Sequence, residues 1–222
     1  MFKKIIIAAI SASFLASAAF ADSTNFGVRF STAELTASGS ENTNLAGTDL
    51  TQNERDATFE IPSVFVEKQM DLSSGLNISL GLDFVPLTED VATLSGGDGT
   101  DGKIKAGNLM TAYIQPSFSV SENISIYGKV GYASGDLKIT DITRQATTAG
   151  TAATDTSADK TLEGPVYGLG IQVNADIGAF SFIRLEGTHT DFDQVTHTNS
   201  NGKVLKADAE MDLVTFTIGK NF

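Results

Sequence analysis

The side chains best suited to act as a catalytic base are two histidines, His189 and His197, in a chain of 222 residues. His189 lies beside Thr188, Thr190 and Asp191, near one end of a segment in which apolar and polar residues alternate. If this segment is a strand of a membrane barrel, the alternation points His189 to the outer face of the barrel. A base in that place could act on lipid headgroups. Acyl-transfer chemistry needs a nucleophile, a base and an orienting acid close together, and no serine stands at a matching spacing. The sequence therefore favours an interfacial histidine without a catalytic role, and it supports His197 still less.

Metal, phosphate and redox motifs are scarce. Residues 96–101, Gly-Gly-Asp-Gly-Thr-Asp, match the start of the calcium-binding nonapeptide repeat, but Lys103 stands where a large apolar residue belongs. Such repeats work by stacking, and a single copy favours chance composition. The sequence has no cysteine, no paired histidines and no complete phosphate-loop motif, since Gly-x-x-x-x-Gly-Lys at residues 97–103 is followed by Ile104 where the motif needs serine or threonine. We expect the protein to have no cofactor, no metal site and no enzymatic activity.

A set of charged residues falls on the more polar face of the alternating segments. If these segments close into a narrow barrel, each charge must pair or reach water. Three basic and three acidic residues can form ion pairs that block the lumen, and buried pairs of this kind are more often structural than gating. The set predicted to line the lumen is Arg29, Glu60, Asp83, Lys129, Arg184 and Glu186.

Eight segments alternate with a period of two, which indicates strands with two different faces. Each has roughly ten residues, close to the 9–11 or so with which a tilted strand crosses a bilayer. Ordinary soluble strands are nearer 5–6 residues, so the lengths favour a membrane protein. The segments are 25–36, 57–68, 76–85, 108–120, 124–134, 165–174, 180–190 and 212–222.

The connections between these segments alternate strictly between long and short. The long ones are 37–56, 86–107, 135–164 and 191–211, and the short ones are 69–75, 121–123 and 175–179. Outer-membrane barrels have short periplasmic turns and longer extracellular loops. An even number of strands then places both termini on the periplasmic side. The long connections carry 17 acidic and 8 basic residues; solvated loops are the simpler reading, and binding of divalent cations is the alternative.

Residues 1–21 have the three parts of a secretory signal peptide, with Lys3 and Lys4 before an apolar run and small residues before a predicted cleavage after Ala21. The short apolar run disfavours the alternative of a membrane anchor. Residues 22–222 then form one domain with 13 basic and 27 acidic residues, a formal charge of −14. Such a domain lacks the basic surface that nucleic-acid binding requires.

Four places fit the pattern badly. In the first segment apolar residues change faces after Phe30, where Ala33 and Leu35 take the formerly polar face. Pro62 and Pro116 interrupt segments that should have neighbours on both sides. Because proline cannot donate to a ladder, each predicts a bulge or a rim position. Lys220 falls on the apolar face near the end of the last segment, where it can snorkel to headgroups.

Several motifs resemble those of a known family. Residues 127–132 (Tyr-Gly-Lys-Val-Gly-Tyr), 164–170 (Gly-Pro-Val-Tyr-Gly-Leu-Gly) and 182–186 (Phe-Ile-Arg-Leu-Glu) are similar to the outer-membrane β-barrel family of Gram-negative bacteria, which includes the OmpA-type membrane domain and opacity-like surface proteins. The resemblance covers nearly all of residues 22–222. It also implies a C-terminal assembly signal, made by Val214, Phe216, Ile218 and Phe222, in which Lys220 departs from the usual pattern.

The sequence thus predicts an all-β fold, an eight-stranded antiparallel up-and-down barrel in the outer membrane. The expected role is structural or surface-exposed, with a plugged lumen. A narrow channel for small solutes is the alternative, and a lipid A-modifying enzyme is the third reading. The expected partners are outer-membrane lipids and, during insertion, the barrel assembly machinery. A soluble β-sandwich is the rival fold.

Overall fold

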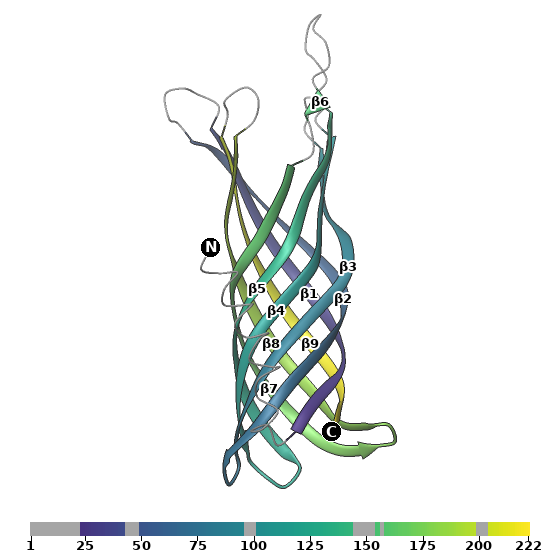
Figure 1. Ribbon diagram of the computed structural model, residues 1–222. Coiled ribbons are helices and arrows are strands. Elements are labelled where there is room, and N and C mark those ends of the chain that lie inside the picture. The colour runs from purple at the N-terminus through teal and green to yellow at the C-terminus, as the bar shows by residue number, and fades with distance from the viewer. Residues whose placement is uncertain (1–22, 43–48, 96–100, 144–153, 156–157, 199–203) are drawn as a thin grey trace, which may run out of the picture.

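The computed structural model describes residues 23–42, 49–95, 101–143, 154–155, 158–198 and 204–222 (Figure 1). The predicted cleavage after Ala21 and residues 96–100 of the calcium-like motif lie outside these ranges. The strands are β1 (Ser23–Asn42), β2 (Asp49–Ser73), β3 (Leu76–Ser95), β4 (Asp101–Ser119), β5 (Ile124–Thr143), β6 (Thr154–Asp155), β7 (Ala158–Ile177), β8 (Phe180–Thr198) and β9 (Val204–Asn221). No helix of the described residues is long and apolar enough to cross a membrane.

Eight of the strands form a closed antiparallel ring. Its order is β4-β3-β2-β1-β9-β8-β7-β5, and β4 pairs with β5 to close it. Strand β6 only adds two residue pairs to β5. The predicted eight-stranded up-and-down barrel is confirmed.

One end of the barrel carries the tight turns and the first and last strand ends (Figure 1). The turns span residues 74–75, 120–123 and 178–179. Gly75 has φ 84° and Gly178 has φ 61°, a left-handed conformation that glycine adopts without a Cβ clash. Thr24 and Phe222 exchange two backbone hydrogen bonds of 2.9 Å, so the first and last strands close the ring at this end.

The eight ring strands have 18 to 25 residues, about twice the predicted length. Most of the expected long loops are therefore strand. At about 3.3 Å per residue, such strands are longer than the 9–11 or so residues with which a tilted strand crosses a bilayer. On β1 the alternation persists from Asn25 to Ser38, but the residues that alternate change in type partway along.

The lower part of the barrel, next to the tight turns, has an apolar outer surface. On β1 the outward residues Phe26, Val28 and Phe30 are 38–56% exposed, and Leu169 on β7 is 75% exposed. A continuous exposed apolar surface of this kind marks contact with a partner or a membrane. We call this band the apolar belt; its other exposed members include Val64, Phe84, Ile114, Phe118, Ile126, Val130, Tyr167, Leu185, Val214 and Phe216.

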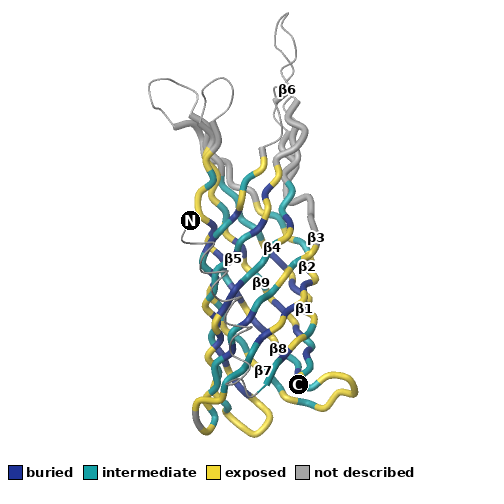
Figure 2. The backbone as a smooth tube through the Cα atoms, viewed as in Figure 1, coloured by how far each residue is buried: buried dark blue, intermediate teal, exposed yellow. Residues whose placement is uncertain are grey.

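Above the belt the apolar side chains lie on the inner face of the barrel and the polar side chains on the outer face. On β1, Thr32 and Glu34 point outward and are exposed, whereas Ala33 is fully buried inside. Figure 2 shows buried and more exposed stretches following one another along the strands of the barrel. The register of β1 with both neighbours has no shift between Asn25 and Gly39. After Phe30 the apolar residues of β1 therefore move from the outer face to the inner face, as the sequence predicted. No bulge in the backbone is involved, since side chains continue to alternate between the two faces. The buried residues of the upper interior are Ala33, Ile61, Ala133, Leu137, Leu162, Val166, Phe192 and Met211.

The prolines mark where the ring loses ladder pairs. The β2–β3 ladder ends at Val64 and Phe84; continued at this register, Pro62 stands opposite Pro86. Neither proline can donate a ladder hydrogen bond, and the irregularity predicted at Pro62 coincides with this end of pairing, although Pro62 keeps its place opposite Phe30 in the β1–β2 ladder. Pro116 needs neither the bulge nor the rim position we expected: it lies exposed in β4, the β4–β5 ladder has no pair at it, and the register is the same on both sides.

Candidate functional site

Five of the six charged residues predicted to line the lumen do point inward. Arg29, Lys129, Arg184 and Glu186 are all at most 4% exposed. Asp83 is less deeply buried, with 18% of its side chain exposed. These residues come from β1, β3, β5 and β8 and gather at one level of the barrel.

Glu60 was placed wrongly. It is exposed on the outer face of β2, because the inward residues of that strand are Ile61, Ser63, Phe65 and Glu67. Glu67, which the sequence analysis missed, is 0% exposed and supplies the third inward carboxylate. The signal that could have found it is the run Val64-Phe65-Val66-Glu67, in which the belt residues Val64 and Val66 fix Glu67 on the inner face.

Glu67 and Arg184 form the centre of the luminal charge network. Arg184 donates from Nη1 to Glu67 Oε2 at 2.9 Å and from Nη2 to Oε1, which is the bidentate geometry that makes such pairs strong. Tyr113 donates its hydroxyl to Glu67 Oε2 at 2.9 Å, and Asn25 donates to Oε1 at 3.0 Å. Both carboxylate oxygens are therefore satisfied, as a fully buried charge requires.

A second group of charges lies beside this pair. Arg29 donates to Asp83 Oδ2 at 2.6 Å and to the Tyr113 hydroxyl at 3.1 Å. Lys129 donates to Glu186 Oε1, and Arg29 Nη1 lies 3.8 Å from the same atom. Tyr113 therefore links both groups into one network with three cations and three carboxylates, and their formal charges cancel.

Aromatic rings fill the space between these charges. The Arg184 guanidinium carbon lies 4.5 Å from the centre of the Phe182 ring, and the Lys129 ammonium lies 4.4 Å from the centre of the Tyr113 ring; such contacts add cation–π attraction. The Tyr113 ring packs directly onto Gly81, where a Cβ would overlap it. Glycine at this inward position makes the room that the ring needs.

The charges and rings lie together at one level of the lumen. A cavity of about 40 Å³ lies against Arg29, Asp83, Lys129 and Glu186. This space is small compared with the roughly 300–1,000 Å³ of ligand pockets in proteins. We call this level the plug.

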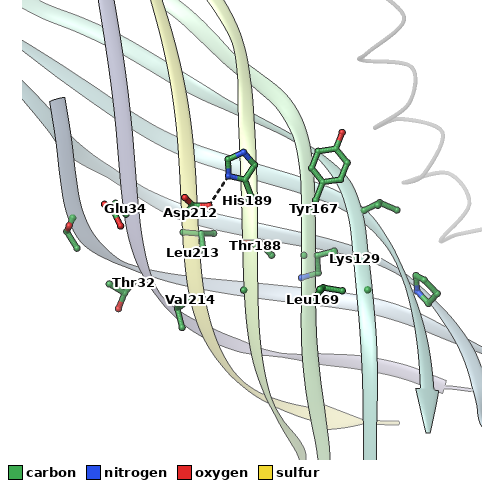
Figure 3. A pocket seen from close by; sticks show the side chains of 16 residues that line it. Thr32, Glu34, Lys129, Tyr167, Leu169, Thr188, His189, Asp212, Leu213 and Val214 are labelled. Atoms are coloured by element: carbon green, nitrogen blue, oxygen red, sulfur yellow. Dashed lines mark hydrogen bonds and ion pairs between the residues drawn. The ribbon is translucent and has the colours of Figure 1, made fainter. Parts of the chain in front are cut away.

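His189 lies on the outer face, as predicted, just above the apolar belt (Figure 3). Its Nδ1 lies 2.8 Å from Oδ1 of Asp212 on β9, and the two side chains are 44% and 69% exposed. The sequence places Asp191 beside His189, but the carboxylate that contacts the ring is Asp212. None of the 16 lining residues in Figure 3 is a serine or a cysteine, so this surface offers a histidine–carboxylate pair without those nucleophiles. His197 lies within β8.

The residues of the predicted assembly signal lie along β9. Val214, Phe216 and Phe222 are 41–67% exposed on the outside, and Phe222 stacks on Phe26 with ring centres 5.2 Å apart. Lys220 is opposite Phe26. The apolar residues thus form part of the belt, while their role in assembly stays a prediction. No group of three or more possible metal ligands occurs among the described residues.

Residues 6–219 match the family described as the outer membrane protein beta-barrel domain. The chain belongs to this family. The outer-membrane location of the barrel follows from that membership, and the apolar belt is the surface that meets the lipid. Among curated proteins, no sequence matches the chain significantly.

Solved structures similar to this outer-membrane barrel include three proteins. Ail, the attachment invasion locus protein of Yersinia pestis, is 12% identical with a TM-score of 0.36, over 85% of this chain and 98% of Ail. Neisserial surface protein A is 10% identical with a TM-score of 0.45, over 87% and 97% of the two chains. The outer membrane protease OmpT from Escherichia coli is 9% identical with a TM-score of 0.45, over 90% and 97%.

Proposed function

We propose that this outer-membrane barrel is a non-conducting surface protein that closes its own lumen and holds its upper half outside the cell. The plug carries this proposal. Six buried charges of zero net charge, packed with aromatic rings, leave about 40 Å³ at this level. An eight-stranded barrel is only just wide enough for its side chains to fill, so a closed lumen suits the geometry.

The orientation is part of the same proposal. Exposed carboxylates occupy the outer face above the belt, among them Glu34, Asp56, Glu60, Asp191 and Asp212. Carboxylates on this face suit water and lipid headgroups, and not hydrocarbon. We therefore assign the tight turns and both chain ends to the periplasm, and the long strands to the outside. Outer-membrane lipids surround the belt, and the assembly machinery recognises the strand that ends at Phe222.

Planar-bilayer recording tests the closed lumen. Purified, refolded wild-type protein is expected to give no stable single-channel steps, because ion pairs and aromatic rings occupy the lumen at the plug and the cavity beside them is only about 40 Å³. A sixteen-stranded porin, which keeps an aqueous channel, serves as the positive control in the same bilayers. Stable, large steps from the wild-type protein would overturn the proposal in favour of the narrow channel.

The lipid-modifying enzyme has one supporting observation, the pair of His189 and Asp212 at the upper edge of the belt. A base held by a carboxylate is part of a hydrolytic constellation, but it needs a nucleophile beside it. Mass spectrometry of lipids from cells that overproduce the wild type or His189→Ala distinguishes a lipid-modifying enzyme from a surface protein without enzymatic activity. A change of acyl chains with the wild type alone would establish it.

A further inference from the structure

We propose that the upper half of the barrel binds one small, uncharged apolar molecule between two facing sheets. This inference goes beyond the proposed function, since a closed surface barrel needs no ligand. It rests on how the ring divides above the plug, on what lines the space, and on the charges at its edges.

The ring divides along two seams above the belt. At the first seam the β2–β3 ladder ends at Val64 and Phe84, although β2 and β3 both continue. At the second seam the β7–β8 ladder ends at Val166 and Thr190, and both strands again continue. The upper half is thus two four-stranded sheets, β8-β9-β1-β2 and β3-β4-β5-β7, whose separation above the ring is visible in Figure 1.

The sequence places prolines at both seams. Pro62 and Pro86 lie at opposite positions just past the last β2–β3 pair, and Pro165 lies just past the last pair of β7 with β8. Three of the four prolines of the chain therefore stand where the ladders stop. Since proline removes a ladder donor, these residues favour the end of pairing at both seams.

The facing inner surfaces of the two sheets are apolar and enclose a chamber of about 310 Å³. Ligand pockets in proteins run from about 300 to 1,000 Å³ and are lined mainly by apolar side chains, so the chamber has room for one small molecule. Several wall residues are only partly buried and can gain contacts from a ligand: Leu35, Phe59, Val85, Leu109, Val195 and Ala209.

The chamber reaches down to the plug. The small cavity beside the charge network shares Ile61, Val85, Leu109 and Met211 with the chamber wall. The absence of a route through the lumen therefore rests on the closed plug of the proposed function. Pro62 and Val85 border both the chamber and the first seam, so access is from the outside or through the side of the barrel.

The charges at the chamber edges decide which ligand fits. The described residues that line it include Asp56, Glu60, Asp136, Asp193 and Asp208, and among these described lining residues there is no lysine, arginine or histidine. Asp56 and Glu60 lie on the outer face of β2, at the edge of the chamber beside the first seam. A carboxylate ligand would meet like charges without a cationic partner, which costs free energy. We therefore assign the chamber to uncharged apolar molecules, and expect it to reject their carboxylate analogues.

The absence of tryptophan from the chain allows a direct test. Phe59→Trp places a single fluorophore in the chamber wall, and Phe216→Trp places one on the lipid face. In lipid vesicles, 1-bromooctane is expected to quench Phe59→Trp saturably, and Phe216→Trp only in proportion to its concentration in the lipid. Carboxylate 8-bromooctanoate is expected to act on Phe59→Trp about tenfold more weakly than 1-bromooctane.

A filling variant gives the matched control. Ala209→Phe, made with Phe59→Trp, occupies the chamber and is expected to abolish saturable quenching. Ala179→Phe, the same change at an exposed turn, is expected to preserve it. Gel migration before and after heating verifies folding of each variant, and Val195→Trp replaces Phe59→Trp if the latter does not fold. Non-saturable quenching of the chamber tryptophan, or saturable quenching that persists in Ala209→Phe, would overturn the inference. Neither result depends on whether the barrel conducts.

Discussion

Glu67→Ala is expected to destabilise the barrel by about 3–5 kcal/mol, because it leaves the buried Arg184 guanidinium without its carboxylate. Arg184 is 2% exposed, so water cannot replace the lost partner. The substitution also removes the acceptor of the Tyr113 hydroxyl and of the Asn25 amide. The free energy of unfolding is measured by urea titration in lipid vesicles, followed by circular dichroism since the chain has no tryptophan.

The matched control for this prediction is Glu60→Ala on the same strand. Glu60 is exposed on the outer face, and surface substitutions of this kind change stability by no more than about 0.5 kcal/mol. A similar loss for the two variants would contradict the assignment of Glu67 to the plug and of Glu60 to the outside.

Leu169→Arg is expected to cost about 2–4 kcal/mol, the penalty for a basic residue on the lipid face near the middle of a bilayer. Leu169 is 75% exposed on β7 between Tyr167 and Ile171, and its neighbours across the sheet are Gly128 and Gly187. No neighbouring side chain therefore shields it from lipid. The same urea titration in vesicles measures the loss.

Thr161→Arg provides the comparison on the same face of the same strand. Thr161 is exposed and lies above the belt, where an arginine meets water. We expect no loss of stability beyond about 0.5 kcal/mol. An equal penalty at both positions would mean that the bilayer covers the upper half as well.

Where one type of residue keeps to one face, the sequence predicts the structure well. Within residues 124–134 of β5 and 180–190 of β8 the alternation is uniform, and Lys129, Arg184 and Glu186 are on the inner face as predicted. The eight strands were predicted from the period of two, and their up-and-down order from the alternation of long and short connections. The closed barrel that this order implies is confirmed by the pairing of β1 with β9.

Where the apolar face changes sides, the same reasoning fails. In β2 the apolar residues Phe59 and Ile61 line the upper interior, whereas Val64 and Val66 meet lipid. A single assignment of apolar residues to the outside therefore turned Glu60 inward and concealed Glu67. The strands beyond the belt were taken as loops for a related reason, since their polar residues face water and resemble those of a loop.

Partner choice within the plug also lay beyond the sequence. Alternation shows that Arg184 and Glu67 point inward once the phase is right, but their meeting depends on the stagger of β2 and β8 across the barrel. The role of Tyr113 as the link between the two charge groups depends on the space above Gly81. Neither feature leaves a local signal.

The central claim is that the barrel leaves the bilayer just above Phe30 and continues with apolar residues inside and polar residues outside. Because the chain has no cysteine, a single cysteine can be introduced at each outward position of β1 and labelled with a spin label. The labelled proteins are refolded into lipid vesicles. Collision rates with oxygen and with a water-soluble nickel complex then report lipid and water at each label. We predict oxygen-dominated collisions at positions 26, 28 and 30, and nickel-dominated collisions at positions 34 and 36. Oxygen-dominated collisions at all five positions would contradict the account.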